Sequence, residues 1–142
     1  MKKKKIVDRS IRLAKRLFLQ SRNKKNPLHF AFLWKKNTLI SVGQNETERT
    51  SAKAFYFAKR FNTPNKIKYP YIHAEVDAIS KAWGKIFINE SFSIVSLRLT
   101  KDGKLNNAKP CKDCQSVIRS AGIGNVYWSN NIGKIEYGKV LY

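Results

Sequence analysis

Two short stretches decide how the chain folds: residues 73–79 (HAEVDAI) and residues 109–114 (KPCKDC). Apolar side chains recur at helical spacing from the first stretch onward, which predicts a helix over residues 73–83. In the second stretch Pro110 is a favoured first helical residue, which predicts a helix over residues 110–120. A glycine follows each predicted helix as a stop signal. Both stretches therefore place polar side chains where a helix begins.

Segments typical of β-strands surround these two helices. Two further helices are predicted, a basic amphipathic one over residues 6–19 (within the N-terminal segment 1–22) and a short one over residues 52–61. Strands that alternate with helices indicate an α/β fold. We therefore expect a single domain over residues 1–142, a three-layer α-β-α sandwich with a mixed five-stranded sheet. The predicted strands are residues 29–34, 38–42, 93–100, 126–129 and 135–140.

The composition limits the class of protein. The chain has 142 residues, of which 42% are hydrophobic and 12% aromatic, enough for the core of one ordinary domain. No run of about 18 apolar residues exists, so no membrane span is expected. The lysine-rich start is not followed by a continuous apolar stretch, unlike a signal peptide. We therefore expect a cytoplasmic protein, in which two cysteines three residues apart indicate metal binding or redox work.

The charge is strongly positive, with 29 basic and 9 acidic residues and a net charge of +20. Such a field attracts polyanions, which makes nucleic acid a candidate partner. Cations and aromatic rings interleave over residues 53–71, as single-stranded nucleic acid binding requires, although these rings can equally belong to the core. The basic stripe Arg9, Arg12 and Arg16 is either a phosphate contact or a solvated helix face. AT-rich coding sequence would also enrich lysine.

The candidate chemistry lies in His73, Glu75, Cys111 and Cys114. Zinc takes four ligands, and one imidazole with two thiolates leaves the fourth position open for water, as in catalytic sites. Because residues two apart on a helix point about 200° apart, His73 and Glu75 can both face one metal only if they straddle the helix start. Glu75 is then the proton carrier. We expect one zinc ion.

Two other readings of the same residues compete. A closed structural zinc site needs a fourth protein ligand, but the sequence has no further cysteine. His29, the other histidine, lies in a predicted strand and is expected in the protein core. A thioredoxin-like redox pair belongs just after a first strand, whereas this pair lies late in the chain.

The residues 73–79 and 109–114 make the chain resemble the cytidine and deoxycytidylate deaminase superfamily, most closely its CMP/dCMP-type members, which include small phage-encoded proteins. The superfamily branch also contains tRNA adenosine deaminases and the AID/APOBEC group. The resemblance implies a cytidine deaminase-like fold, zinc ligands at His73, Cys111 and Cys114, and an acid/base at Glu75. It further implies that the backbone of Ala74 contacts the base; Asn45 and Pro110 are the other expected substrate contacts.

The chain departs from parts of this pattern. It lacks the additional zinc ligands of some larger dCMP deaminases. Asn-Ala-Lys stands at residues 107–109, where AID/APOBEC members commonly have serine-tryptophan-serine. The expected function is hydrolytic deamination of cytosine to uracil, with single-stranded DNA or RNA as the leading substrate. A free dCMP or CMP, adenosine in tRNA, and a non-catalytic zinc module that binds nucleic acid are the alternatives. The sequence leaves the oligomeric state open.

Overall fold

A mixed β-sheet forms the centre of the molecule in the computed structural model, which describes residues 2–21, 28–45, 73–84, 87–89 and 91–139. The strand order is β2-β1-β3-β5-β6, and β4 pairs with the C-terminal end of β3. β3 and β5 are parallel, and the other pairs are antiparallel. The strands are β1 (Leu28–Lys35), β2 (Thr38–Gln44), β3 (Phe92–Leu99), β4 (Leu105–Asn106), β5 (Asn125–Ser129) and β6 (Ile135–Lys139).

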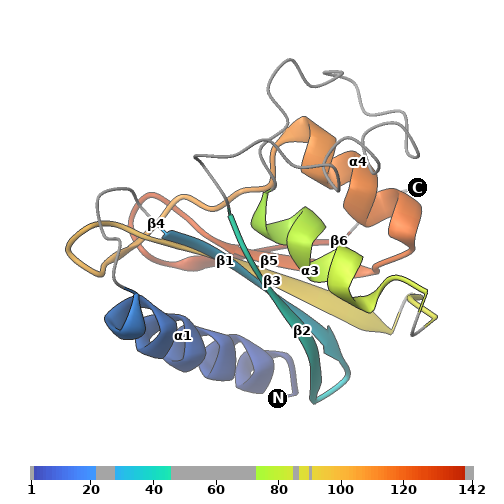
Figure 1. Ribbon diagram of the computed structural model, residues 1–142, viewed down its shortest axis with the longest axis horizontal. Helices are drawn as coiled ribbons and strands as arrows, with labels where there is room; N and C mark the ends of the chain where they lie inside the picture. The colour runs from blue at the N-terminus through green and yellow to red at the C-terminus, as the bar shows by residue number, and fades with distance from the viewer. Residues whose placement is uncertain (1, 22–27, 46–72, 85–86, 90, 140–142) are drawn as a thin grey trace.

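Helices cover both faces of this sheet, so the expected three-layer sandwich is confirmed (Figure 1). α1 (Lys2–Gln20) lies on one face, and α3 (Ala74–Ala82) and α4 (Lys112–Ala121) lie on the other. The sheet has six strands where the sequence predicted five. The additional strand, β4, follows the turn at residues 101–104 and pairs with β3. It has only two residues, too few to leave a pattern in the sequence. The predicted helix 52–61 and the basic-aromatic stretch 53–71 lie outside the described residues.

Each face of the sheet has its own apolar core, and β1 contributes to both. Its side chains alternate, because successive residues of a strand point to opposite faces. Ala31 and Leu33 pack with α3 and α4. Phe30, Phe32 and Trp34 pack with α1. β1 is therefore buried on both faces, which explains why its sequence is almost continuously apolar.

α1 is held to the sheet by its apolar side and by one buried hydrogen bond. Ile6, Val7, Ala14 and Phe18 are buried against the strands. The indole nitrogen Nε1 of Trp34 donates to Oγ of buried Ser10 at 2.9 Å. The described helices include none long and apolar enough to cross a membrane.

The two helices on the other face begin at the residues that the sequence singled out. His73 is the N-cap of α3 and has extended backbone angles, φ −86° and ψ 154°. Cys111 is the N-cap of α4, where its sulfur accepts from the backbone N–H of Cys114. α4 therefore begins two residues after Pro110, so the prediction of Pro110 as first helical residue was wrong. A capping side chain requires an extended residue before the first turn, and Cys111 occupies that place.

One glycine sets how closely α3 approaches the sheet. A Cβ built on Gly43 of β2 would lie 2.0 Å from the carbonyl oxygen of Ala74 and 2.4 Å from the backbone nitrogen of Ala78. No side chain larger than hydrogen fits between these backbones. Gly43 therefore allows the first turn of α3, which carries Glu75, to rest directly on β2.

Candidate active site

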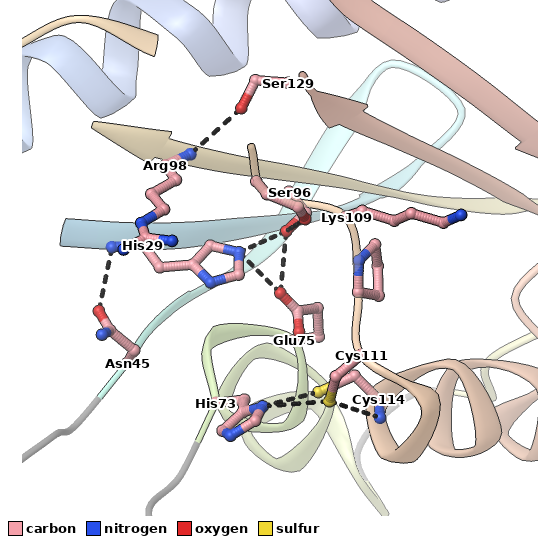
Figure 2. Close-up of polar contacts among 12 residues, drawn as sticks. His29, Asn45, His73, Glu75, Ser96, Arg98, Lys109, Cys111, Cys114 and Ser129 are labelled. Atoms are coloured by element: carbon pink, nitrogen blue, oxygen red, sulfur yellow. Dashed lines mark hydrogen bonds and ion pairs between the residues drawn. The ribbon is translucent and has the colours of Figure 1, made fainter. Parts of the chain in front are cut away.

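Three potential metal ligands converge where α3 and α4 begin (Figure 2). Nδ1 of His73 lies 3.2 Å from Sγ of Cys114 and 3.5 Å from Sγ of Cys111. His73 and Cys111 are exposed, whereas Cys114 is buried. A search of the His, Cys, Asp and Glu side chains in the described residues finds this one group of three that is compact enough to hold a metal ion.

The spacing of these atoms suits zinc. Zinc binds sulfur at about 2.3 Å and imidazole nitrogen at about 2.0 Å, and tetrahedral angles then put nitrogen and sulfur roughly 3.5 Å apart. The two nitrogen–sulfur distances, 3.2 Å and 3.5 Å, lie close to that value. One imidazole and two thiolates are also the donor types that zinc prefers. The set is thus a candidate zinc site with three protein ligands and room for a fourth, non-protein ligand.

The two cysteines are not equivalent. A hydrogen bond from the Cys114 thiol, helped by His73 and by the backbone N–H of Cys114, lowers the pKa of Cys111 to about 4 against the opposing effect of burial. The same hydrogen bond, together with burial, raises the pKa of Cys114 well above its ordinary value. In the metal-free protein Cys111 is therefore a thiolate at neutral pH, and Cys114 holds the proton that a metal ion must displace.

Glu75 is a carboxylate enclosed behind the candidate zinc site. Its side chain is 1% exposed. Its Oε1 accepts from Oγ of Ser96 at 2.8 Å and lies 2.8 Å from Nε2 of His29. Burial alone would raise the pKa of Glu75, but the charge and hydrogen bond of His29, with hydrogen bonds from Cys114 and Ser96, lower it to about 2. Both partners hold Oε1, and Cys114 is the third hydrogen-bond partner of the carboxylate.

His29 belongs to this site, so its expected place in the core was wrong. It shares a face of β1 with Ala31 and Leu33, and that face looks toward α3 and α4. The side chain is 20% exposed, and Nε2 contacts both Glu75 and Oγ of Ser96. The signal was present in the sequence, because His29 is the one polar side chain of the predicted strand 29–34, but its direction depends on strand pairing.

The expected substrate contacts are distributed around Glu75. Asn45 follows β2 and forms a closed pair with His29: Asn45 Oδ1 accepts from His29 N at 3.0 Å, and Asn45 N donates to His29 O at 3.1 Å. Ala74 is the first residue of α3, so its N–H has no partner within the helix. Pro110 is buried beside Cys111, and its carbonyl accepts from Nε2 of Gln115. Ala74 thus offers a donor beside Glu75, and Asn45 is linked to that carboxylate through His29.

Arg98 is a residue of this region that the sequence reasoning missed. It lies two positions beyond Ser96 on β3, so both side chains point to the same face of the sheet. It also pairs in register with His29 of β1 (Figure 2). The Arg98 side chain is exposed. A guanidinium therefore stands at the exposed side of the candidate site, next to His29 and Asn45.

Comparisons with known proteins agree with this geometry. Residues 4–130 match the family model described as the cytidine and deoxycytidylate deaminase zinc-binding region. A comparison with curated protein sequences finds no match. Among solved structures, dCMP deaminase from the cyanophage S-TIM5 in apo form is similar, with a TM-score of 0.53 and 20% identity over 89% of this chain and 83% of that one.

The same cyanophage enzyme in complex with dCMP and dUMP gives a TM-score of 0.54 and 19% identity, over 89% and 82% of the two chains. Cytidine deaminase from Burkholderia pseudomallei gives a TM-score of 0.56 and 15% identity, over 93% and 91%. These structures share the fold of this chain, and the family model covers nearly all of it. The chain belongs to the cytidine and deoxycytidylate deaminase family and is a zinc-dependent hydrolytic deaminase.

Proposed function

We propose that this deaminase converts cytosine to uracil in single-stranded nucleic acid, with His73, Cys111 and Cys114 holding the zinc ion. The observation that carries the catalytic part is the 1% exposed carboxylate of Glu75, placed on the same helix start as His73. A metal site that only stabilises the fold does not need this carboxylate. A thiolate site also needs reduced cysteines, which supports a cytoplasmic location.

When bound, zinc supplies a water molecule that ionises near neutral pH. In the proposed reaction Glu75 would accept a proton from the attacking water and pass it to the ring nitrogen N3 of cytosine, while the water oxygen bonds to C4. Glu75 then carries the second proton to the amino group, the C4–N bond breaks, and ammonia leaves. One water is consumed and one ammonia is released for each uracil formed.

The residues around Glu75 hold the base and the carboxylate in place. The free backbone N–H of Ala74 is a donor for the oxygen at the base edge. Oδ1 of Asn45 is held by the backbone of His29, which aims the amide nitrogen Nδ2 away from β1. Nδ2 has no hydrogen-bond partner in the part of the chain that the structure describes, and we assign it to the sugar. Ser96 and His29 fix the rotamer of Glu75.

The charge around the site supports a polynucleotide. Arg98 on β3, Lys109 before the cysteines and Lys112 at the start of α4 are all exposed. A strand threaded past the site presents several phosphates to such cations. The second candidate is a free nucleotide such as dCMP, which needs only one phosphate contact. Arg98, which pairs with His29 beside Asn45, is sufficient for that contact.

One parallel assay separates these substrates. The zinc-loaded protein is incubated with dCMP, cytidine, a single-stranded DNA and an RNA, with Glu75→Ala as control. Uracil in a polymer pool, with turnover that falls steeply as salt rises, supports the proposal because phosphate contacts are screened by salt. Turnover of dCMP alone, insensitive to salt, selects the free nucleotide. Inosine selects adenosine in tRNA, and full biological activity of Glu75→Ala selects the non-catalytic zinc module.

A further inference from the structure

We propose that the exposed side of α1 is a nucleic-acid binding surface, separate from the active site and on the opposite face of the sheet. α1 covers the face that α3 and α4 leave free (Figure 1). The metal ligands and Glu75 belong to the α3 and α4 side. The deaminase reaction uses nothing on α1, so the basic side chains of this helix have no role in the chemistry described above.

The cations of α1 form one continuous stripe. At 100° per residue, the exposed cations of the helix fall within a sector of about 120°. From Lys4 to Arg16 the stripe rises by 12 residue steps, or about 18 Å along the axis. In a duplex, phosphates of one strand are about 3.4 Å apart along the axis, so the stripe spans roughly five of them. The exposed cations are Lys4, Lys5, Arg12, Lys15 and Arg16.

Within the part of the chain that the structure describes, no ion pair neutralises these charges. Asp8, the one acidic residue of α1, is exposed and lies in the same sector. Ion pairs within the described residues join His29 to Glu75 and Lys81 to Asp77, and neither pair involves α1. Arg9, by contrast, is occupied: it donates to the carbonyl of Asn37 at 2.9 Å and lies 4.7 Å above the ring of Trp34. The five exposed cations are therefore available to a polyanion.

The same helix does not suit a membrane surface. A helix that binds in the plane of a bilayer must bury its apolar side among the lipids. The apolar side of α1 is already buried in the core through Ile6, Val7, Ala14 and Phe18. Leu19 is the one apolar side chain on the exposed stripe. Phosphates of a polynucleotide need only the charged side, so they fit α1 without any change of the fold.

This surface does not depend on the proposed function. A polymer bound at α1 raises the local concentration of nucleic acid near the enzyme, whatever the enzyme deaminates. Binding at α1 should therefore persist when the zinc site is inactive. In this way a failure of the α1 surface and a failure of the proposed substrate give different results.

The test measures fluorescence anisotropy of labelled 20-nucleotide single-stranded DNA, RNA and duplex DNA against salt. Arg12→Gln/Arg16→Gln removes two stripe cations, and Arg119→Gln/Lys134→Gln removes two exposed cations from α4 and from the β5–β6 turn. We expect Arg12→Gln/Arg16→Gln to weaken single-strand binding at least tenfold. The slope of the logarithm of the binding constant against the logarithm of salt should become less steep by about 1.4, because each of the two lost phosphate contacts contributes roughly 0.7. Arg119→Gln/Lys134→Gln should change the affinity and the salt slope little. Glu75→Ala should bind nucleic acid as tightly as the parent protein does.

Three results would overturn the proposal. Equal weakening by the two double variants would mean that total charge alone attracts the polymer. Unchanged binding by Arg12→Gln/Arg16→Gln would mean that the polymer binds elsewhere. Tighter binding to vesicles of anionic phospholipid than to any of the nucleic acids would make α1 a membrane contact. Thermal unfolding of each variant, followed by circular dichroism, shows that the fold is intact.

Discussion

Nε2 of His29 lies 2.8 Å from Oε1 of Glu75, so a residue of the central sheet holds the buried carboxylate of the active site. The contact joins β1 to α3 across the site, and Ser96 of β3 reinforces it. A carboxylate that is 1% exposed needs such partners, because burying an unpaired charge is costly. His29 also positions Asn45 through its backbone. One residue thus orients both the proton carrier and a proposed substrate contact.

Replacing His29 with alanine should reduce kcat by roughly ten- to a hundredfold, the usual effect of removing a group that orients a catalytic residue. The substrate does not lose a direct contact, so KM should change less than kcat. Steady-state kinetics on whichever substrate is turned over measure this split. His29→Gln retains a donor for Glu75 and should recover a large part of kcat. Equal loss in both variants, or no loss in His29→Ala, would show that Glu75 does not need this contact.

The metal-free protein should be alkylated by iodoacetamide at Cys111, at a rate that is nearly constant between pH 6 and 8. The pKa of Cys111 is lowered to about 4, so the thiolate is fully formed throughout this range. An ordinary thiol, with a pKa near 8.5, becomes about tenfold more reactive per pH unit there. Mass spectrometry after timed quenching identifies the modified residue.

Cys114→Ala is the matched control for the Cys111 prediction. The Cys114 thiol is the largest cause of the lowered Cys111 pKa, and alanine removes this hydrogen-bond donor. Alkylation of Cys111 in this variant should regain a dependence on pH. In the parent protein, added zinc should suppress the reaction. A tenfold rise per pH unit in the parent would contradict the shared proton between the two sulfurs.

Each chain should bind one zinc ion, and the bound zinc should stabilise the fold. At a thousandfold excess over its Kd, a ligand of the native state adds about 4 kcal/mol, which raises Tm by roughly 10 °C in a chain of this size. Elemental analysis and thermal unfolding before and after chelation measure both quantities. Cys111→Ser should lose the metal and the stabilisation, whereas Glu75→Gln should keep both and lose activity. Loss of zinc in Glu75→Gln would make Glu75 a ligand.

The parts of the fold that follow a local pattern were predictable from the sequence. Residues 73–83 and 110–120 were expected as helices from spacing and stop signals, and α3 and α4 lie there. The sequence also required the His-Ala-Glu motif to straddle a helix start, and His73 is the extended N-cap of α3. The start of α4 was misplaced at Pro110, because the capping role of Cys111 depends on where its sulfur points.

The parts that depend on strand pairing were not predictable. His29, Ser96 and Arg98 come together only because β1 and β3 pair antiparallel, with His29 opposite Arg98. A single sequence gives the alternation along each strand, but neither the partner strand nor the register. The two residues of β4 likewise form a strand only because they pair with β3. For the same reason His29 was expected in the core although it lies beside Glu75.

Gly43→Ala should be the most damaging single-methyl substitution near the active site. The new Cβ would lie 2.0 Å from the carbonyl oxygen of Ala74 and 2.4 Å from the nitrogen of Ala78, so β2 and α3 must separate. Overpacking of this kind costs about 3 kcal/mol or more when the obstacle is backbone rather than a side chain that can rotate. Because α3 carries Glu75 and follows His73, zinc affinity should fall as well. Urea unfolding and zinc titration measure the two effects.

Gly84→Ala is the control for Gly43→Ala. A Cβ on residue 84 meets nothing within 4 Å, although the φ of +77° makes alanine cost about 1 kcal/mol there. If the two variants lose equal stability, the strain of the added methyl group lies in backbone conformation and not in the contact between β2 and α3.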